Sequence, residues 1–140
     1  MTANSSDTNS KMTGFRIEGI DHVALTVRDL EASIVWYQEV LGLERPHNAW
    51  NNNPAVLCAG DTCVALFAAR TDNPADTPDV SRTIVMKHLA FRVDRPNFEA
   101  AQTTLRVKGI EFEFADHEIS HSIYFNDLSG HLLEITTYDL

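Results

Sequence analysis

The sequence is poor in positive charge: 11 lysine and arginine residues stand against 20 aspartate and glutamate residues, which gives a formal net charge of -9. Such a chain would be repelled by the phosphates of a nucleic acid, and it offers no basic patch for a membrane surface. Long apolar runs are also missing, since none approaches the roughly 20 residues that a membrane-spanning helix needs. These deficits exclude nucleic acids and membranes as expected partners.

The first residues, MTANSSDTNSKMTG, lack the apolar core of a secretory signal. Their composition predicts a disordered tail over residues 1–16, and a cytoplasmic location follows as the default. Cysteine is scarce, with Cys58 and Cys63 flanking a predicted hairpin turn, AGDT. The two can face each other across neighbouring strands, but without a secretion signal we expect reduced, buried thiols.

What the chain does contain is an internal repeat. The segment IDHVALTV at 20–27 and the segment MKHLAFRV at 86–93 are each followed by a helical stretch that ends at a glycine. The histidines of the two segments lie 66 positions apart and the glycines, Gly42 and Gly109, lie 67 apart. A chain of 140 residues is long enough for one domain with a core, so the repeat indicates two similar halves of that domain.

Each half reads as strand, helix and then further short strands. Helices are predicted over 29–42 and 94–109, each with an aspartate able to cap its first turn and a glycine at its end. Alternating apolar residues predict the strands, and the polar, proline-containing stretch 70–84 separates the halves. We therefore predict an α+β fold of two βαβββ modules, residues 17–69 and 85–140, whose curved mixed sheets enclose a cleft.

Side chains alternate between the two faces of a strand, which sorts the predicted strand residues. In the first repeated segment, Val23, Leu25 and Val27 would face the helix, and His22 would face away from it. The same alternation places four residues on the faces opposite the helices: His22, His88, Tyr124 and Glu134.

Two imidazoles and one carboxylate converging on a cleft suit a divalent metal ion with open coordination positions. The plainer alternative is a hydrogen-bonded histidine in each sheet and a solvated Glu134. Pattern alone leaves both interpretations open.

Three stretches resemble the vicinal oxygen chelate superfamily, which includes glyoxalase I, extradiol dioxygenases, fosfomycin-resistance enzymes and bleomycin-binding proteins. They are IDHVALTVRDLEASIVWYQEVLGL, KHLAFRV and SIYFNDLSGHLLEITTY. The last is similar to the family ending Tyr-Phe-x-Asp-Pro-x-Gly-x-x-x-Glu, except that Leu128 replaces the proline. The resemblance covers residues 18 to 138, and it implies paired βαβββ modules with His22, His88 and Glu134 as metal ligands.

The subfamily is less clear from the residues. Glyoxalase I-like members carry a fourth ligand in the last strand of the first module, where we align Leu66 with Glu134. Three ligands are typical of extradiol dioxygenases and fosfomycin-resistance enzymes. The dioxygenase signature has a histidine shortly before the Ile-Tyr pair, a position that His117 or His121 would fill. Fosfomycin-type members often have a threonine where this chain has Ala24.

The resemblance implies a metal-dependent enzyme acting on a small molecule that binds the metal through vicinal oxygens, by a dioxygenase-like or a fosfomycin-type thiol-transfer reaction. The metal would be Fe(II), Mn(II), Zn(II) or Ni(II), and the protein a homodimer whose modules pair within one chain or are exchanged between two. The alternative is a metal-free dimeric drug-binding protein of the bleomycin-resistance type.

We expect catalytic roles for Tyr124 and His121, although parity turns His121 away from the cleft unless its strand begins after it. Tyr124 can instead pack against the cavity wall. Substrate contacts are expected from residues on the cleft face and in a polar loop: Trp50, Arg92 and Ser122. Trp50 can also cover the dimer seam, and Arg92 can pair with a neighbouring acid.

Overall fold

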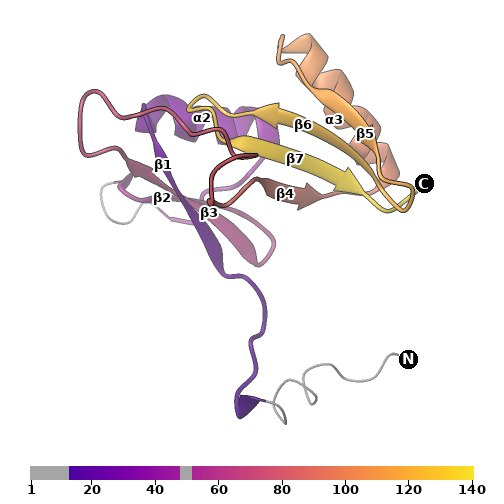
Figure 1. The fold of residues 1–140 in the computed structure, drawn as a ribbon, viewed down its shortest axis with the longest axis horizontal. Helices are drawn as coiled ribbons and strands as arrows, with labels where there is room; N and C mark the ends of the chain where they lie inside the picture. The colour runs from indigo at the N-terminus through magenta and orange to yellow at the C-terminus, as the bar shows by residue number, and fades with distance from the viewer. Residues whose placement is uncertain (1–12, 48–51) are drawn as a thin grey trace.

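The computed structural model describes residues 13–47 and 52–140, which form two small mixed sheets with one helix packed against each (Figure 1). The first module contains β1 (His22–Val27), α2 (Leu30–Leu41), β2 (Ala55–Ala59) and β3 (Thr62–Ala68). The second contains β4 (Leu89–Arg92), α3 (Arg95–Val107), β5 (Glu113–Asp116), β6 (His121–Asn126) and β7 (Leu132–Thr137). The predicted α+β class with a duplicated module is confirmed. None of the helices in the described ranges is long and apolar enough to cross a membrane.

The two sheets have the same arrangement at one end. Their strand orders are β1-β3-β2 and β4-β7-β6-β5, and both β1 and β4 run parallel to their single neighbour. In the first module the strand expected after the helix is reduced to an isolated bridge between Glu44 and Cys58. Pro46 follows closely and has no N–H group to extend a ladder, which accounts for the short pairing.

The helix ends follow the predicted capping residues. The side chain of Asp29 accepts a hydrogen bond from the backbone N–H of Ala32, and α2 ends at Gly42, whose φ of 67° is left-handed. Asp94 likewise accepts from the N–H of Asn97 at the start of α3, which has Pro96 in its first turn. The caps satisfy backbone groups that a helix end leaves unpaired, so they fix where each helix meets its sheet.

The helix-facing sides of both sheets contribute to one hydrophobic core. Alternation along the strands is confirmed, because Ile123 and Phe125 are buried while Asn126 is exposed. The ring of Trp36 on α2 lies 6.3 Å from the ring of Phe125 on β6, which joins the modules. The largest fully buried core residues come from both halves: Val27, Tyr37, Leu57, Leu66, Phe98, Leu105, Ile123, Phe125 and Leu133.

A buried hydrogen bond also links the modules. The hydroxyl of Tyr37 on α2 donates to Oδ2 of Asp127, at 2.6 Å, in the turn between β6 and β7. The other carboxylate oxygen of Asp127 accepts from the backbone N–H groups of Ser129 and His131 at 3.0 and 2.9 Å. Asp127 thus holds together a turn in which Leu128 stands in place of the family's proline. Burial, followed by the charge of Asp127, raises the pKa of Tyr37, so its hydroxyl stays protonated and acts as donor.

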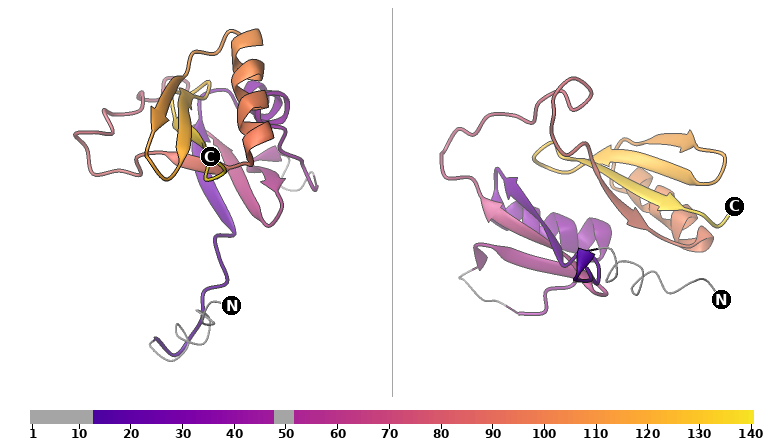
Figure 2. Two further views of the ribbon diagram at one scale, coloured as in Figure 1. Left: turned by 90° about the vertical axis from the view of Figure 1, so that its right-hand side faces the viewer. Right: turned by 60° about the horizontal axis from the view of Figure 1, so that its bottom comes forward.

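The same turn contacts the end of β1. Ser129 Oγ accepts from the N–H of Arg28 at 2.9 Å, and His131 Nε2 donates to the carbonyl of Thr26 at 2.8 Å. Figure 2 shows the two sheets as separate units that are not closed into one barrel. Residues 69–88, all within the described part of the chain, connect them without forming a helix or strand.

The cysteines differ from expectation. Cys58 and Cys63 occupy directly paired positions on β2 and β3, with Cα atoms 4.0 Å apart, and form a disulfide. The prediction of reduced thiols is therefore wrong for this structure. It rested on cellular compartment, whereas the hairpin register places the two sulfur atoms face to face.

Replacing Tyr37 with phenylalanine tests the link between the modules. The change leaves Oδ2 of buried Asp127 without its donor, and a lost hydrogen bond to a buried charged group costs about 1–3 kcal/mol. We expect the free energy of unfolding to fall by that amount in guanidinium titrations. The control, Tyr138→Phe, alters a residue that is 50% exposed and should change stability by less than about 0.5 kcal/mol. Wild-type stability in the Tyr37→Phe variant would contradict the proposed link.

Candidate metal centre and its surroundings

The candidate site lies on the face of the second sheet that points away from α3. Glu134 on β7 is the cross-strand neighbour of Ala90 on β4 and of Tyr124 on β6. Ser122 pairs with Thr136 one step along the same face. The alternation predicted from sequence therefore places these polar side chains on one surface.

Glu134 is 7% exposed, and both of its carboxylate oxygens have partners. Oε1 lies 2.9 Å from Nε2 of His88, the residue immediately before β4. Oε2 accepts a hydrogen bond from Ser122 Oγ at 2.6 Å. The same Ser122 Oγ lies 2.9 Å from Thr136 Oγ1. A buried carboxylate is costly without such partners, so the sheet surface both tolerates Glu134 and fixes its orientation.

The spacing of His88 and Glu134 fits a shared cation. Nitrogen and oxygen ligands lie roughly 2.0–2.2 Å from a divalent metal such as zinc, so two adjacent ligand atoms on one ion are about 3 Å apart. The observed separation of 2.9 Å matches this spacing. Nδ1 of His88 is buried and has no hydrogen-bond partner among residues 13–47 and 52–140. A native structure seldom leaves such an atom unsatisfied, so Nδ1 of His88 is available to a group that this chain does not supply.

Tyr124 borders this pair. The ring of His88 meets the ring of Tyr124 edge-on at 5.7 Å, and the hydroxyl of Tyr124 lies 3.0 Å from Nε2 of His117. Burial raises the pKa of Tyr124, and the charge of Glu134 raises it further. The phenol therefore keeps its proton at neutral pH and can donate it in a hydrogen bond.

The turn after β5 positions His117. The backbone N–H of Glu118 bonds to Asp116 Oδ1 at 2.8 Å, and Glu118 has a φ of 71°, which is uncommon for a residue other than glycine. Sequence analysis left the role of His117 undecided. The sequence signal that could have placed His117 was its position in the strand alternation. Glu113 pairs with Tyr124, and every second residue after Glu113, ending with His117, is expected on the same face of the sheet.

An open hollow of about 810 Å³ adjoins Tyr124, and its lining extends to Arg106 at the end of α3. Its wall also includes Glu113, Asn126 and Leu132, which offer a carboxylate, an amide and an apolar surface. A hollow of this size and mixed chemistry can hold a small molecule beside Tyr124.

The third expected ligand, His22, lies elsewhere. It begins β1 in the first sheet, its side chain is 53% exposed, and its Nδ1 lies 2.7 Å from Asp21 Oδ2. Across the described ranges, no three histidine, cysteine, aspartate or glutamate side chains are grouped closely enough to hold a metal. The expected cleft with all three ligands is therefore not formed within one chain. The reason is topological, since β1 pairs with β3 and β4 with β7, and the two sheets do not join.

Two other predicted site residues, His121 and Ser122, do not lie where a substrate contact would need them. β6 begins at His121, whose ring lies on the helix side, 5.2 Å from Phe114, with Nδ1 2.8 Å from an Arg95 nitrogen of α3. The structure thus separates His121 from Tyr124. Ser122 is fully buried beneath Glu134, so it orients the carboxylate in this state.

Arg92 lies on the His88 face of β4, with its guanidinium 4.5 Å from the centre of the Tyr138 ring. Trp50 lies outside the described residues.

The strand register also corrects the alignment of the two modules. Ala24 pairs with Ala65, as Ala90 pairs with Glu134. The counterpart of Glu134 is therefore Ala65, and the alignment with Leu66 was shifted by one residue. Neither residue can ligate a metal, so the first module still supplies no fourth ligand on β3.

Several known proteins are similar to this chain in sequence and in fold. The family model of the Glyoxalase/Bleomycin resistance protein/Dioxygenase superfamily matches residues 19–135. Glutathione transferase FosA of Serratia marcescens is 31% identical over 85% of this chain and 80% of its own length. Metallothiol transferase FosB of Staphylococcus haemolyticus is 29% identical over 89% and 86%. The structure of a glyoxalase/dioxygenase from Nostoc punctiforme, 24% identical, superposes with a TM-score of 0.74 over 86% and 90% of the two chains and shows the shared fold.

Replacing Glu134 with alanine tests whether its carboxylate is buried and paired with His88 and Ser122. The change removes the partner of both His88 Nε2 and Ser122 Oγ. Because buried groups left unpaired cost about 1–3 kcal/mol, we expect metal-free protein to lose stability by that amount in urea titrations. Glu113→Ala, at an exposed neighbour on the same face, should have little effect. Equal stability of the two variants would show that Glu134 is solvated.

Proposed function

Because the chain is an enzyme of the glyoxalase/bleomycin resistance protein/dioxygenase superfamily, we propose that it holds a divalent metal with His22, His88 and Glu134. Its substrate would be a small molecule that binds this metal through two adjacent oxygens. The observation that carries the proposal is the 2.9 Å approach of His88 Nε2 and Glu134 Oε1 on an open sheet face. The imidazole and carboxylate donors suit Fe(II), Mn(II), Zn(II) and Ni(II).

The third ligand would come from a second copy of the chain. β1 and β4 are outer strands at equivalent places in their sheets, and an outer strand offers unpaired backbone groups to another strand. His22 begins β1, and His88 immediately precedes β4. Pairing of β1 with β4 of a second copy would therefore bring His22 toward His88 and Glu134. The homodimer would contain two such sites, each built from both chains.

The residues around the site have separable roles. A bound metal would act as a Lewis acid that stabilises negative charge on the substrate oxygens. Ser122 would keep Glu134 in its ligating orientation, as outer-shell hydrogen bonds do in metal sites. Tyr124 would donate a hydrogen bond to a substrate oxygen in the adjoining hollow. Arg92 would hold an anionic group of the substrate, with its guanidinium positioned by the Tyr138 ring.

We propose thiol transfer of the fosfomycin type as the reaction, supported by the similarity to FosA and FosB over most of each chain. In such a step the thiol first gives up its proton to solvent, and its sulfur then bonds to a substrate carbon while a carbon–oxygen bond of that substrate breaks. The released oxygen takes up a proton, and the hydroxyl of Tyr124, whose ring contacts His88, would donate it. His117 would return a proton to Tyr124 across the 3.0 Å contact.

A second candidate reaction is oxidative ring cleavage of a catechol. The contact between His117 and Tyr124 favours it, because a histidine and a tyrosine on one face form a pair able to move a proton to or from a bound phenol. His117 is also one of the two histidines, with His121, that would fill the histidine position of the dioxygenase signature.

Metal analysis tests the shared site. We expect wild-type protein to bind one divalent ion per chain, and His22→Ala, His88→Ala and Glu134→Ala each to lose most of it. His131→Gln, which keeps a donor for the Thr26 carbonyl, serves as the control and should retain the metal. An equimolar mixture of His22→Ala and His88→Ala chains, unfolded and refolded together, should recover about a quarter of the wild-type metal content. Half of the dimers would then be mixed, each with one intact site.

A mixture that stays metal-free, together with metal loss in each single variant, would contradict the exchange between chains. Full metal content in the His22→Ala variant would remove His22 from the site. Tight substrate binding after exhaustive chelation would instead support the metal-free binding protein.

The reaction is assigned by two assays on the metal-loaded protein. Thiol transfer predicts consumption of glutathione with fosfomycin, whereas ring cleavage predicts oxygen uptake with catechol. Tyr124→Phe should lower kcat about 10²–10⁴-fold in the reaction that needs its proton, with metal content unchanged. Arg92→Ala, which lies outside the proton path, should mainly raise KM. Activity in neither assay would reject both reactions while leaving the metal site to be judged by its own measurement.

A further inference from the structure

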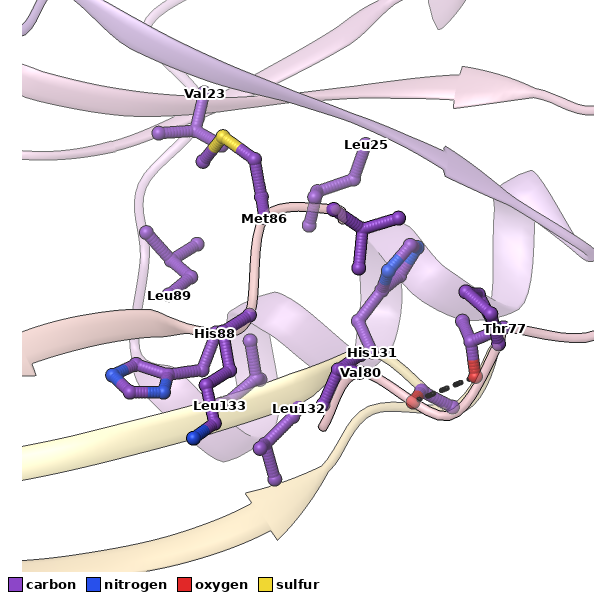
Figure 3. Close-up of a pocket in the computed structure, with 14 residues that line it drawn as sticks. Val23, Leu25, Thr77, Val80, Met86, His88, Leu89, His131, Leu132 and Leu133 are labelled. Atoms are coloured by element: carbon purple, nitrogen blue, oxygen red, sulfur yellow. Dashed lines mark hydrogen bonds between the residues drawn. The ribbon is translucent and has the colours of Figure 1, made fainter. Parts of the chain in front are cut away.

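A second cavity, of about 270 Å³, lies at the junction of the two modules. Its walls come from both: Val23 and Leu25 of β1 on one side, and Leu132 and Leu133 of β7 on the other. Figure 3 shows Met86 extending from the linker between these walls toward Val23. The cavity is distinct from the hollow beside Tyr124, which has Leu132 as its one residue in common with this wall.

The lining is mostly apolar, and its polar side chains are those of Thr77, Lys87, His88 and His131. Thr77 Oγ1 donates to the carbonyl of Gly130 at 3.3 Å, and His131 uses Nε2 to reach the carbonyl of Thr26 at 2.8 Å (Figure 3). An apolar ligand would therefore meet apolar side chains over most of its surface, whereas a cation would lose its hydration and be repelled by Lys87.

The roof of the cavity exposes apolar surface. Val85 is 44% exposed and Met86 is 76% exposed, although both side chains border an apolar wall. Methionine is flexible and adapts its shape to what it covers. A ligand beneath these residues would bury surface that the chain alone leaves in water, and this burial favours binding.

Size and chemistry together define the ligand class. A cavity of about 150 Å³ lined by aliphatic and aromatic side chains is large enough to bind benzene in another protein. The cavity here is larger, at about 270 Å³, and is lined mainly by aliphatic side chains and Met86. We propose that it binds a small, uncharged, apolar molecule, such as one aromatic ring or a short hydrocarbon chain, next to His88.

A ligand bound in the cavity would affect the candidate metal site through one shared residue, His88. His88 lines the cavity and also contacts Glu134 at 2.9 Å. Leu133, in the opposite wall, immediately precedes Glu134. A ligand that shifts this wall would therefore change the surroundings of His88. The inference does not depend on the reaction proposed above, because it is tested by binding alone.

The test uses benzene as the probe and the full-length protein with ¹³C-labelled methionine methyl groups. The chain has three methionines, so the Met86 signal is assigned by its loss in Met86→Leu. We expect a saturable ring-current shift at Met86. Benzylammonium, a cation of similar shape, should bind at least about tenfold more weakly, because its charge pays a desolvation cost in the cavity and is repelled by Lys87.

A cavity-filling variant locates the probe. Val80→Phe places a larger side chain in the lining and should weaken benzene binding at least about tenfold, since the cavity then lacks the volume for a ring. The matched control, Val35→Phe, makes the same change at a residue of α2 that is 48% exposed and should bind as the wild type does. Benzene affinity that is unchanged in Val80→Phe, or the absence of a saturable Met86 shift in the wild type, would overturn the site. The latter is also the result expected if a second copy of the chain fills the cavity.

The link to His88 has its own readout. In protein labelled at its histidine rings, benzene should shift the His88 imidazole signals along the same saturation curve as Met86. The signals of His117, which lies beyond Tyr124, should stay in place and serve as the internal control. Saturable binding at Met86 with unmoved His88 signals would overturn the coupling between cavity and candidate metal site.

Discussion

The hydrogen bond from Tyr37 to Asp127 is the interaction on which the arrangement of this chain depends. It joins α2 of the first module to the turn between β6 and β7, the two strands that carry Tyr124 and Glu134. Asp127 is nearly buried, and its second oxygen accepts two backbone N–H groups, so one carboxylate fixes both the turn and its docking on the helix. The candidate site is therefore held in place by a contact that lies on the other side of the sheet.

Docking of the modules through their helix sides has a consequence for function. It places the apolar faces in a common core and leaves the polar faces of the two sheets on separate surfaces. The second module holds His88, Glu134 and Tyr124 together, whereas the first presents His22 on an exposed outer strand. The proposed three-ligand site would therefore need groups from two copies of the chain, and the outer strands β1 and β4 are where such copies would pair.

Within the second module, the candidate site uses few charged residues, each with a defined partner. Glu134 is oriented from below by Ser122 and from the side by His88, and Tyr124 is oriented by His117. Rigid strands supply Glu134, Ser122 and Tyr124, while His117 depends on a turn with an uncommon backbone conformation at Glu118. A site of this kind loses little conformational entropy when a metal or substrate binds, because the protein has already ordered the groups that meet it.

Residue order alone was enough to predict the duplicated α+β fold, the helix caps at Asp29 and Asp94, and the face on which His88, Tyr124 and Glu134 lie. These features follow from local periodicity, which depends on bond geometry and burial along a single strand or helix. The superfamily was recognised from the resemblance of three sequence motifs. Only the placement of one element against another produced the disulfide, the register that makes Ala65 the counterpart of Glu134, the buried role of Ser122, the separation of His121 from Tyr124, and the separation of His22 from His88 and Glu134. Each of these depends on how one element is placed against another, and alternation along a strand specifies a face but not what that face meets.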